Sequence, residues 1–338
     1  MPVPTNQPQF APEHTQVESP AAPSLPLVVI LGPTASGKST LAVEVARRCG
    51  GEVLCCDSTQ VYRHFNIGTS KVTDEERQGV PHHLVDLLEP HEVFTAGDYR
   101  RRALEALVDL RTRSRLPVLT AGTGLYLRAL LEGLADAPTR LEKLRERLRS
   151  RARGRGPEYV HRILGRLDSE SAARIAPRDS AKTIRAIEVC LASGRPMSEV
   201  LRRPQQALQG YEPIKIGLMP PRAALYERIE RRTQSMLDAG WLDEVRVLLA
   251  RGFGPDAKPF QFIGYGELRA HLNGVVDLKT ATHAIQQATR RYAKRQITWF
   301  RREKNVEWFE GFGDSREITQ SVLATLGRML EAARPAGA

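Results

Sequence analysis

Hydrophobic residues follow two different periods along this chain. Five consecutive apolar residues at 27–31 precede a glycine-rich turn, and the segment after the turn carries its apolar residues at helical spacing. Further apolar runs lie at 52–57 and 116–124, with a helical pattern over 96–115 between them. Strands that alternate with helices predict a parallel sheet with helices on both faces.

The pattern changes between residues 139 and 209, where no convincing strand occurs. Helical periodicity appears over 140–154, 156–167 and 180–194, separated by Pro and Gly. A strand-like run at 214–219 restores the earlier pattern, and a long helix is expected around 282–303. The chain therefore predicts an α/β fold that is interrupted by an all-helical insertion.

These patterns divide the chain into five parts. We expect a disordered tail at 1–24, a first part of the α/β core at 25–138 and a helical insertion at 139–210. The core then resumes at 211–314 and ends in a basic helix, and a C-terminal helix and tail occupy 315–338. The first 24 residues lack the basic start and apolar core of a secretory signal.

Positive charge is concentrated in two of these parts. The formal net charge is +11; residues 140–203 hold 17 Lys or Arg against 8 Asp or Glu, and residues 286–304 hold 7 against 1. Such segments favour anionic partners, nucleic acid among them. The four cysteines show no metal-site spacing, and no apolar run is long enough to span a membrane. We therefore expect reduced thiols, a cytoplasmic protein and no membrane partner.

The sequence "GPTASGKS" fits the phosphate-binding pattern G-x-x-x-x-G-K-[ST] in full, between an expected strand and an expected helix. Backbone N–H groups of such a loop form an anion site, the lysine adds a positive charge and the final hydroxyl can hold Mg²⁺. Nucleoside triphosphates are the common ligands, although any diphosphate fits. The predicted residues are Gly32, Pro33, Thr34, Ala35, Ser36, Gly37, Lys38 and Ser39.

Asp57 ends the strand that follows this loop and its helix. Because ligands bind outside the carboxyl ends of parallel strands, we expect Asp57 to face the phosphate site, and Thr123 to reach the same edge from the next strand. The Asp57 carboxylate could also cap a helix or contact Mg²⁺ through water. His82 and His83 have no spaced partner and are expected in a structural loop.

A basic face is predicted on the long helix near the C-terminus. Arg291, Lys294, Arg295 and Thr298 recur at helical spacing, and Tyr292, Trp299 and Phe300 supply aromatic rings. Basic side chains beside rings suit single-stranded or looped RNA. A solvated basic helix that is anchored to the core by its aromatic residues is the alternative.

These residues are compatible with three classes of P-loop protein: a small-molecule kinase, an RNA-binding module without catalysis, and an RNA-modifying enzyme. A small-molecule kinase would share the loop and the nearby acid but would not need the basic segments, whereas a GTPase should carry N-K-x-D and D-x-x-G motifs that are not in place. A non-catalytic P-loop RNA-binding module is also possible. An RNA-modifying enzyme explains both the anion site and the basic segments.

The chain resembles the tRNA dimethylallyltransferases, also called tRNA isopentenyltransferases. The blocks "GPTASGKS", "DSTQVYRHFNIGTSK", "PHHLVDLLEP", "TAGTGLYLRALLEGL", "RIAPRDSAKTIRAIEV", "FIGYGE" and "YAKRQITWFR" occur in the family's order. The resemblance implies a P-loop NTPase-like fold. It also implies transfer of a dimethylallyl group from dimethylallyl diphosphate to N6 of the adenosine 3′-adjacent to the anticodon, position 37, of tRNAs reading codons that begin with U.

The resemblance also implies roles for single residues. Asp57 would act as the base, Thr123 would lie at the same site, Lys38 and Arg232 would bind the diphosphate, and Ser39 would hold Mg²⁺; Arg228 competes with Arg232. The partners would be the tRNA anticodon stem-loop and dimethylallyl diphosphate, and we expect a monomer. The implied tRNA contacts are Asp57, Ser58, Thr59, Gln60, Thr123, Arg145, Ala181, Lys182, Thr183, Ile184, Arg185, Gln261, Ile263, Gly264, Tyr265, Lys294, Arg295, Gln296, Thr298, Trp299 and Arg301.

Two positions depart from the family's usual pattern. Ala121 stands where the family usually has glycine, which adds one methyl group near a strand end. The pair Ala181 and Lys182 stands where Gln-Arg is usual, which keeps one positive charge but loses arginine's forked donors.

Overall fold

The structure is a computed structural model that describes residues 24–135, 137–202 and 206–333. The predicted N-terminal tail lies outside the described residues except for its last residue. No helix within these described ranges has the length and apolar character needed to cross a membrane.

A six-stranded parallel sheet forms the centre of the molecule, in the order β3-β2-β4-β1-β5-β6. The strands are β1 Leu25–Leu31, β2 Gly51–Cys56, β3 His82–His83, β4 Leu116–Ala121, β5 Tyr211–Leu218 and β6 Val306–Phe309. After β1 the chain builds one side of the sheet, and it crosses to the other side only after β4. The P-loop at the end of β1 therefore lies where the strand order reverses, which is the usual ligand site of such sheets.

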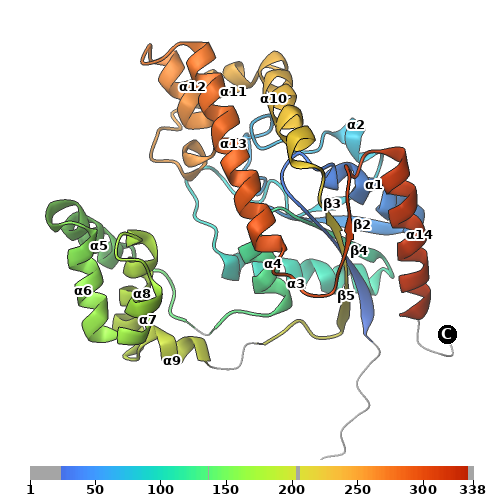
Figure 1. Cartoon of the computed structure of the whole chain (residues 1–338). Helices are drawn as coiled ribbons and strands as arrows, with labels where there is room; N and C mark the ends of the chain where they lie inside the picture. The colour runs from blue at the N-terminus through green and yellow to red at the C-terminus, as the bar shows by residue number, and fades with distance from the viewer. Residues whose placement is uncertain (1–23, 136, 203–205, 334–338) are drawn as a thin grey trace, which may run out of the picture.

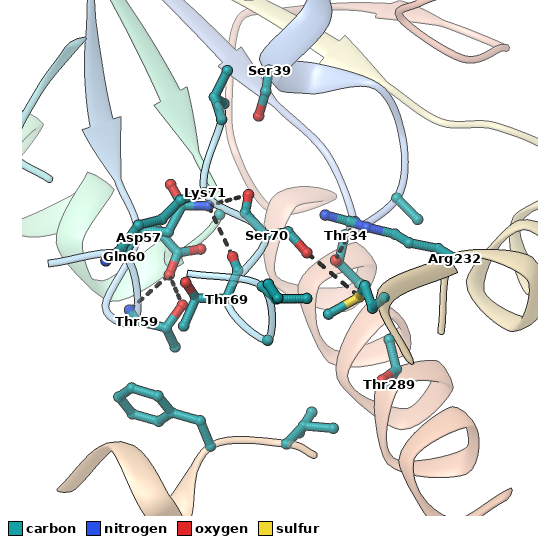
Figure 2. A pocket seen from close by; sticks show the side chains of 18 of the residues that line it. Thr34, Ser39, Asp57, Thr59, Gln60, Thr69, Ser70, Lys71, Arg232 and Thr289 are labelled. Atoms are coloured by element: carbon teal, nitrogen blue, oxygen red, sulfur yellow. Dashed lines mark hydrogen bonds between the residues drawn. The ribbon is translucent and has the colours of Figure 1, made fainter. Parts of the chain in front are cut away.

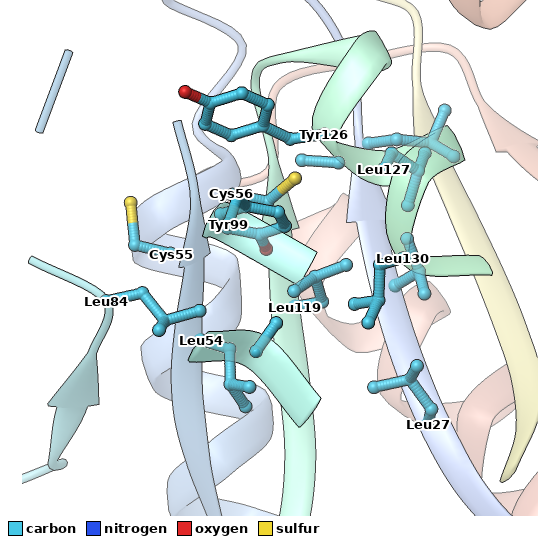
Figure 3. Close-up of a cluster of buried hydrophobic side chains, with 14 of the residues drawn as sticks. Leu27, Leu54, Cys55, Cys56, Leu84, Tyr99, Leu119, Tyr126, Leu127 and Leu130 are labelled. Atoms are coloured by element: carbon cyan, nitrogen blue, oxygen red, sulfur yellow. The ribbon is translucent and has the colours of Figure 1, made fainter. Parts of the chain in front are cut away.

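Helices cover both faces of the sheet (Figure 1). Val28 and Ile30 of β1 pack with α1 Lys38–Cys49 and α14 Arg316–Ala332. Leu27, Val29 and Leu31 pack on the other face with α3 Ala96–Thr112 and α4 Gly124–Leu131 (Figure 3). Since β1 is buried on both faces, its sequence is a continuous apolar run instead of an alternating one. The predicted layers are confirmed.

A second group of helices lies beyond the carboxyl ends of the strands. It consists of α10 Arg222–Asp238, α11 Trp241–Ala250, the 3₁₀ turn Lys258–Gln261, α12 Tyr265–Leu272 and α13 Leu278–Phe300. Trp241, Tyr265 and Phe260 form its core together with Phe65, from the segment between β2 and the short helix α2 Asp74–Arg77. This packing places residues 61–67 above the sheet edge.

Where the structure describes it between 139 and 202, the insertion contains helices and no strand, as predicted. Its helices are α5 Glu142–Arg155, α6 Pro157–Leu167, α7 Ser169–Arg174, α8 Ser180–Ser193 and α9 Met197–Arg202. Leu148, Val160, Leu164 and Ile187 form a separate small core. In Figure 1 this bundle stands apart from the sheet, on the side of α4.

The chain enters and leaves the insertion at neighbouring points. The Leu208 N–H donates to Leu131 O at 3.0 Å, and the Arg100 guanidinium donates to Gln206 O at 2.5 Å. These contacts tie the segment that leaves the insertion to the end of α4, where the chain enters it, and to α3.

Two strands differ from expectation. His82 and His83, expected in a loop, form β3 because they pair with Val53 and Leu54 of β2, and His83 Nε2 lies 2.7 Å from the Glu52 carboxylate. β6 was not expected, since Val306–Phe309 is short and follows a charged segment, but it pairs with β5 over four residues.

Candidate active site

The P-loop joins the central strand β1 to helix α1. Ala35 and Gly37 have positive φ angles of 63° and 83°, so the backbone adopts the left-handed conformation at two positions within the loop. Alternating handedness of this kind turns successive N–H groups toward one concave side, which is the geometry of backbone anion sites. A Cβ on Gly37 would lie 2.8 Å from the backbone N of Asp314, so only glycine fits here.

Lys38 is half-buried at the end of this loop. Its Nζ donates to Pro33 O at 2.7 Å. Burial lowers the pKa of Lys38 to about 8; the charge of Asp57 partly opposes this shift, and the nearby Arg232 charge adds to it. The ammonium group is therefore held in place but poorly solvated, and an anion in the loop would stabilise its charged form.

Asp57 follows β2 immediately, at the edge of the sheet beside the P-loop. Its Oδ1 accepts hydrogen bonds from Thr59 N at 2.8 Å and from Thr59 Oγ1 at 2.6 Å (Figure 2). Oδ2 lies against Gly122, where a built Cβ would come within 2.7 Å of it. One oxygen of the carboxylate is therefore fixed, and the other is available to a ligand.

Thr123 lies behind this carboxylate, at the start of α4. Its N–H and that of Gly122 both donate to Cys56 O at 3.0 Å. Its Oγ1 accepts a hydrogen bond from Ser58 N at 3.1 Å and lies 3.3 Å from Ser58 Oγ. The predicted proximity of Thr123 to Asp57 agrees with this arrangement, in which Thr123 orders the turn after Asp57.

Two arginines from α10 approach the P-loop, and their contacts differ. Arg232 Nη1 lies 3.4 Å from Thr34 Oγ1 of the loop, and burial lowers its pKa. Arg228 is instead paired with the Asp314 carboxylate through both of its terminal nitrogens. Arg232 is thus placed to contact a loop-bound anion, and Arg228 is already neutralised.

A cavity of about 920 Å³ connects these groups. Its walls come from the P-loop and α1, the turn after β2, the segment 66–73, the 261–263 segment and the facing sides of α10 and α13. Ile229, Met236 and Ile285 make part of the wall apolar. The cavity therefore combines a phosphate site, a carboxylate and an apolar surface.

Ser39 is the residue available to a metal. Within the described residues no three His, Cys, Asp or Glu side chains cluster as metal ligands. Ser39 lines the cavity in the first turn of α1. Mg²⁺ often combines one or two protein oxygens with phosphate oxygens and water. The donor set fits a Mg²⁺ ion that Ser39 and a bound diphosphate would hold together.

Comparison with known proteins identifies the family. The family model described as IPP transferase matches residues 60–303, more than half of the chain. The chain belongs to the IPP transferase family. It is 48% identical over 306 residues to a tRNA dimethylallyltransferase from Solibacter usitatus, covering 90% of this chain and 99% of that one. The tRNA dimethylallyltransferase of Koribacter versatilis is 51% identical over 292 residues, 86% of this chain and 95% of that one.

Solved structures of IPP transferases share the fold. The tRNA isopentenylpyrophosphate transferase of Bacillus halodurans gives a TM-score of 0.68 at 37% identity, covering 91% of this chain and 97% of that one. A eukaryotic dimethylallyltransferase described as acting on tRNA gives a TM-score of 0.79 at 25% identity, covering 93% and 81%. The P-loop NTPase-like fold class is confirmed, and the transferase family is favoured over a small-molecule kinase.

In this IPP transferase, many of the expected tRNA-contact residues lie at or near the cavity. Asp57, Ser58, Thr59, Gln60, Gln261, Ile263, Arg295 and Gln296 line it. Lys294, Thr298 and Arg301 are exposed on α13 or directly after it, and Ala181 and Lys182 are exposed at the start of α8.

Other expected contact residues have buried side chains. Thr183 and Tyr265 are 0% exposed, Ile184 is 5% exposed, and Tyr265 donates a hydrogen bond to Glu244 Oε1 at 2.7 Å. A Cβ on Gly264 would lie 2.0 Å from the Trp241 ring. These four residues pack elements of the fold together, so a tRNA contact at these positions would use main-chain atoms; the contact itself stays a prediction.

Arg145 and Arg185 are partly committed to an internal ion pair. Arg145 binds both carboxylate oxygens of the buried Glu188 at 2.8 Å, and Arg185 binds one at 2.5 Å. The bonds from Arg145 join α5 to α8. Any tRNA contact by either arginine would use the part of its guanidinium that remains exposed.

Most of the aromatic residues of α13 pack against the rest of the protein and are not displayed on the outer surface of the helix. Phe300 is 1% exposed within the sheet's core. Trp299 packs on Gly124 and under the Arg128 guanidinium, 4.9 Å from the ring centre. Tyr292 alone among the three faces the cavity, with its hydroxyl 3.4 Å from Gly122 O. The expected basic helix is thus held by its aromatic residues, as the alternative interpretation proposed.

Sequence reasoning missed one charged residue that lines the cavity and one that supports its wall from behind. Lys71 is almost fully buried and donates to Tyr62 O and to the Asp86 carboxylate, both at 2.5 Å. Glu244 accepts backbone N–H bonds from Asn66 at 2.9 Å and from Ile67 at 2.8 Å. These two side chains hold the wall formed by residues 66–71. No motif signals Glu244, since its partners are 177 and 178 residues away.

Proposed function

We propose that this chain transfers a dimethylallyl group from dimethylallyl diphosphate to N6 of the adenosine 3′-adjacent to the anticodon, position 37, of tRNAs reading codons that begin with U. The observation that carries this proposal is the single cavity into which the P-loop and Asp57 both open. The names of the relatives support the same reaction. A kinase would leave the basic insertion unexplained.

The reaction forms one bond and breaks another. N6 of adenosine attacks C1 of the dimethylallyl group, the bond from C1 to the diphosphate oxygen breaks, and diphosphate leaves with the electron pair. The exocyclic amine becomes acidic as it bonds to carbon, so a carboxylate in hydrogen-bond reach can accept its proton. Asp57 Oδ2 is suited to this role because Thr59 occupies Oδ1 and leaves Oδ2 facing Gly122.

The P-loop would bind the departing diphosphate. Its backbone N–H groups, Lys38 and Arg232 supply positive charge where negative charge increases on the leaving group. Mg²⁺, held by Ser39 together with the diphosphate, would supply further charge stabilisation. The apolar wall at Ile229, Met236 and Ile285 suits the hydrocarbon part of the substrate.

The RNA would approach between α13 and the turn after Asp57. Adenosine must leave its base stack to reach the cavity, and this costs least in an unpaired loop. The exposed basic residues of α13 and of the insertion are suited to the phosphates that flank that loop. A cytoplasmic monomer fits this function and remains a prediction; the four cysteines are all free in the described part of the chain.

The direct test is incorporation of label from dimethylallyl diphosphate into tRNA. We expect label in an unmodified transcript that reads U-initial codons, and none when guanosine replaces the adenosine at position 37. Consumption of ATP on a small metabolite, without any labelling of tRNA by the folded protein, would refute the proposal in favour of a kinase.

A further inference from the structure

Gln296 makes an unusual pair of contacts from the buried side of α13. Its side chain is 6% exposed. Oε1 accepts a hydrogen bond from Thr34 N at 2.7 Å, and Nε2 donates one to Gly122 O at 2.7 Å. One amide group thus joins the P-loop to the turn after β4.

The two ends of this bridge are both parts of the reaction site. Thr34 belongs to the anion-binding loop, and Arg232 contacts its hydroxyl. Gly122 lies directly against Asp57 Oδ2. The Gln296 amide therefore links the P-loop, where the diphosphate would bind, to the turn that packs against the Asp57 carboxylate.

Few side chains could make both contacts. The carboxamide donates through nitrogen while it accepts through oxygen, whereas a carboxylate only accepts and an ammonium only donates. Both polar atoms of Gln296 are satisfied, so its burial is stable, but removal of either partner would leave a buried group unpaired.

The position of Gln296 on α13 connects this bridge to the RNA-facing surface. Its neighbour Arg295 lines the cavity mouth, and Lys294 and Thr298 are exposed. The family resemblance implies that Gln296 contacts tRNA. Its burial and its two backbone partners indicate a different role.

We infer that Gln296 is a positioning residue that fixes the distance between the diphosphate site and the Asp57 carboxylate. The inference rests on the proposed prenyl transfer. In this role Gln296 acts through its hydrogen bonds to Thr34 and Gly122, and not through a contact with either substrate. Loss of the bridge should slow the chemical step, because a displacement of about 1 Å between reacting groups can cost about 100-fold in rate.

The test compares Gln296→Met, which keeps the side chain's length but loses both hydrogen bonds, with the parent chain. We expect kcat for tRNA prenylation to fall by about 10- to 100-fold, with tRNA Kd within about twofold of the parent. Gln287→Met is the matched control, because it makes the same substitution at an exposed position of the same helix. Its kcat should stay within about twofold of the parent.

Three outcomes would overturn the inference. A folded Gln296→Met variant with parental kcat would exclude a positioning role, and a large rise in tRNA Kd at unchanged kcat would restore Gln296 as an RNA contact. A kcat loss that disappears when rates are divided by the folded fraction would indicate structural support alone.

If Gln296→Met does not fold, Gln296→Asn, too short to reach both partners, takes its place. A parent chain without prenyl transfer would instead refute the proposed function itself.

Discussion

The two oxygens of Asp57 have different environments, and this difference defines the first prediction. Thr59 holds Oδ1 through two hydrogen bonds, and Oδ2 is free to accept a proton. Asp57→Ala should reduce kcat by about 10² to 10⁴, the usual contribution of a general base. The tRNA Kd, measured by filter binding, should change little. Loss of tRNA binding with turnover intact would assign Asp57 to RNA recognition instead.

Gly122 allows the position of the Asp57 carboxylate to be tested without replacement of Asp57 itself. A methyl group at this position would lie 2.7 Å from Asp57 Oδ2, closer than real Cβ contacts. Gly122→Ala should therefore displace the carboxylate and lower kcat by about 10-fold or more, with the KM for tRNA nearly unchanged. Gly327→Ala is a suitable control, since Gly327 is exposed on α14 and a Cβ there meets no atom within 4 Å. Unchanged kcat in Gly122→Ala would place the proton acceptor elsewhere.

Lys38 predicts how diphosphate binding depends on pH. Because burial lowers its pKa to about 8, the free protein carries a charged Lys38 below that pH and a neutral one above it. Affinity for inorganic pyrophosphate should therefore weaken as pH rises through about 8. Lys38→Arg should lose this step, since arginine stays charged throughout the range. Calorimetric titrations on both sides of that pKa would check this; equal pH profiles for both proteins would contradict it.

At the scale of elements, the buried Glu188 links α5 to α8. Burial alone would raise its pKa, but hydrogen bonds from Arg145, Arg185 and Leu141 N outweigh burial and lower the pKa to about 2. A lowered pKa contributes stability that is complete above the unfolded value of about 4.3 and is lost as pH falls toward the folded value.

The insertion should therefore loosen as pH falls from about 4.3 toward about 2. Protection factors of amides in α5 and α8, taken relative to the intrinsic exchange rate at each pH, should fall over this range in the parent chain. Glu188→Gln, which has no titrating group, should exchange faster at neutral pH and show a weaker acid dependence. Parallel acid profiles for the two proteins would show that other carboxylates control the transition.

Elements were predictable from sequence where the apolar pattern was long. β1, α13 and the helical insertion follow directly from their patterns, and Asp57 and Lys38 from their places after strands. β3 and β6 were missed because two and four residues carry little periodic signal, and pairing with β2 and β5 defines them. The bonds of Gln296 and Glu244 depend on contacts across 174 to 262 residues, which no local pattern encodes.

At the scale of the whole molecule, many of the basic residues lie away from the cavity where the reaction would occur. The cavity lies between the sheet and the α10–α13 group, and one basic segment lies beside it on α13, whereas the larger basic segment lies on the insertion. Arg147, Arg151 and Arg155 are exposed on α5 at intervals of four residues, so they share one face. These arginines are suited to phosphate contacts away from the reacting base.

Replacement of Arg147, Arg151 and Arg155 by alanine should weaken tRNA binding similarly for all tRNAs. It should also reduce the slope of log K against log salt by about one for each phosphate that the variant no longer neutralises. The rate at saturating tRNA should remain near the parental value. A titration of tRNA affinity against salt would measure the slope; an unchanged slope would exclude this face of α5 from the RNA interface.

The hydrogen bond between Leu208 and Leu131 has a consequence for how this protein could diversify. Since the insertion begins and ends at neighbouring points, the sheet accommodates the whole bundle as it would a short hairpin loop. The bundle has its own small core and shares little of the sheet's. The bundle could therefore be exchanged as a unit. We expect that a bundle from a relative, joined at these two residues, would change which RNAs bind while the residues of the cavity stay the same.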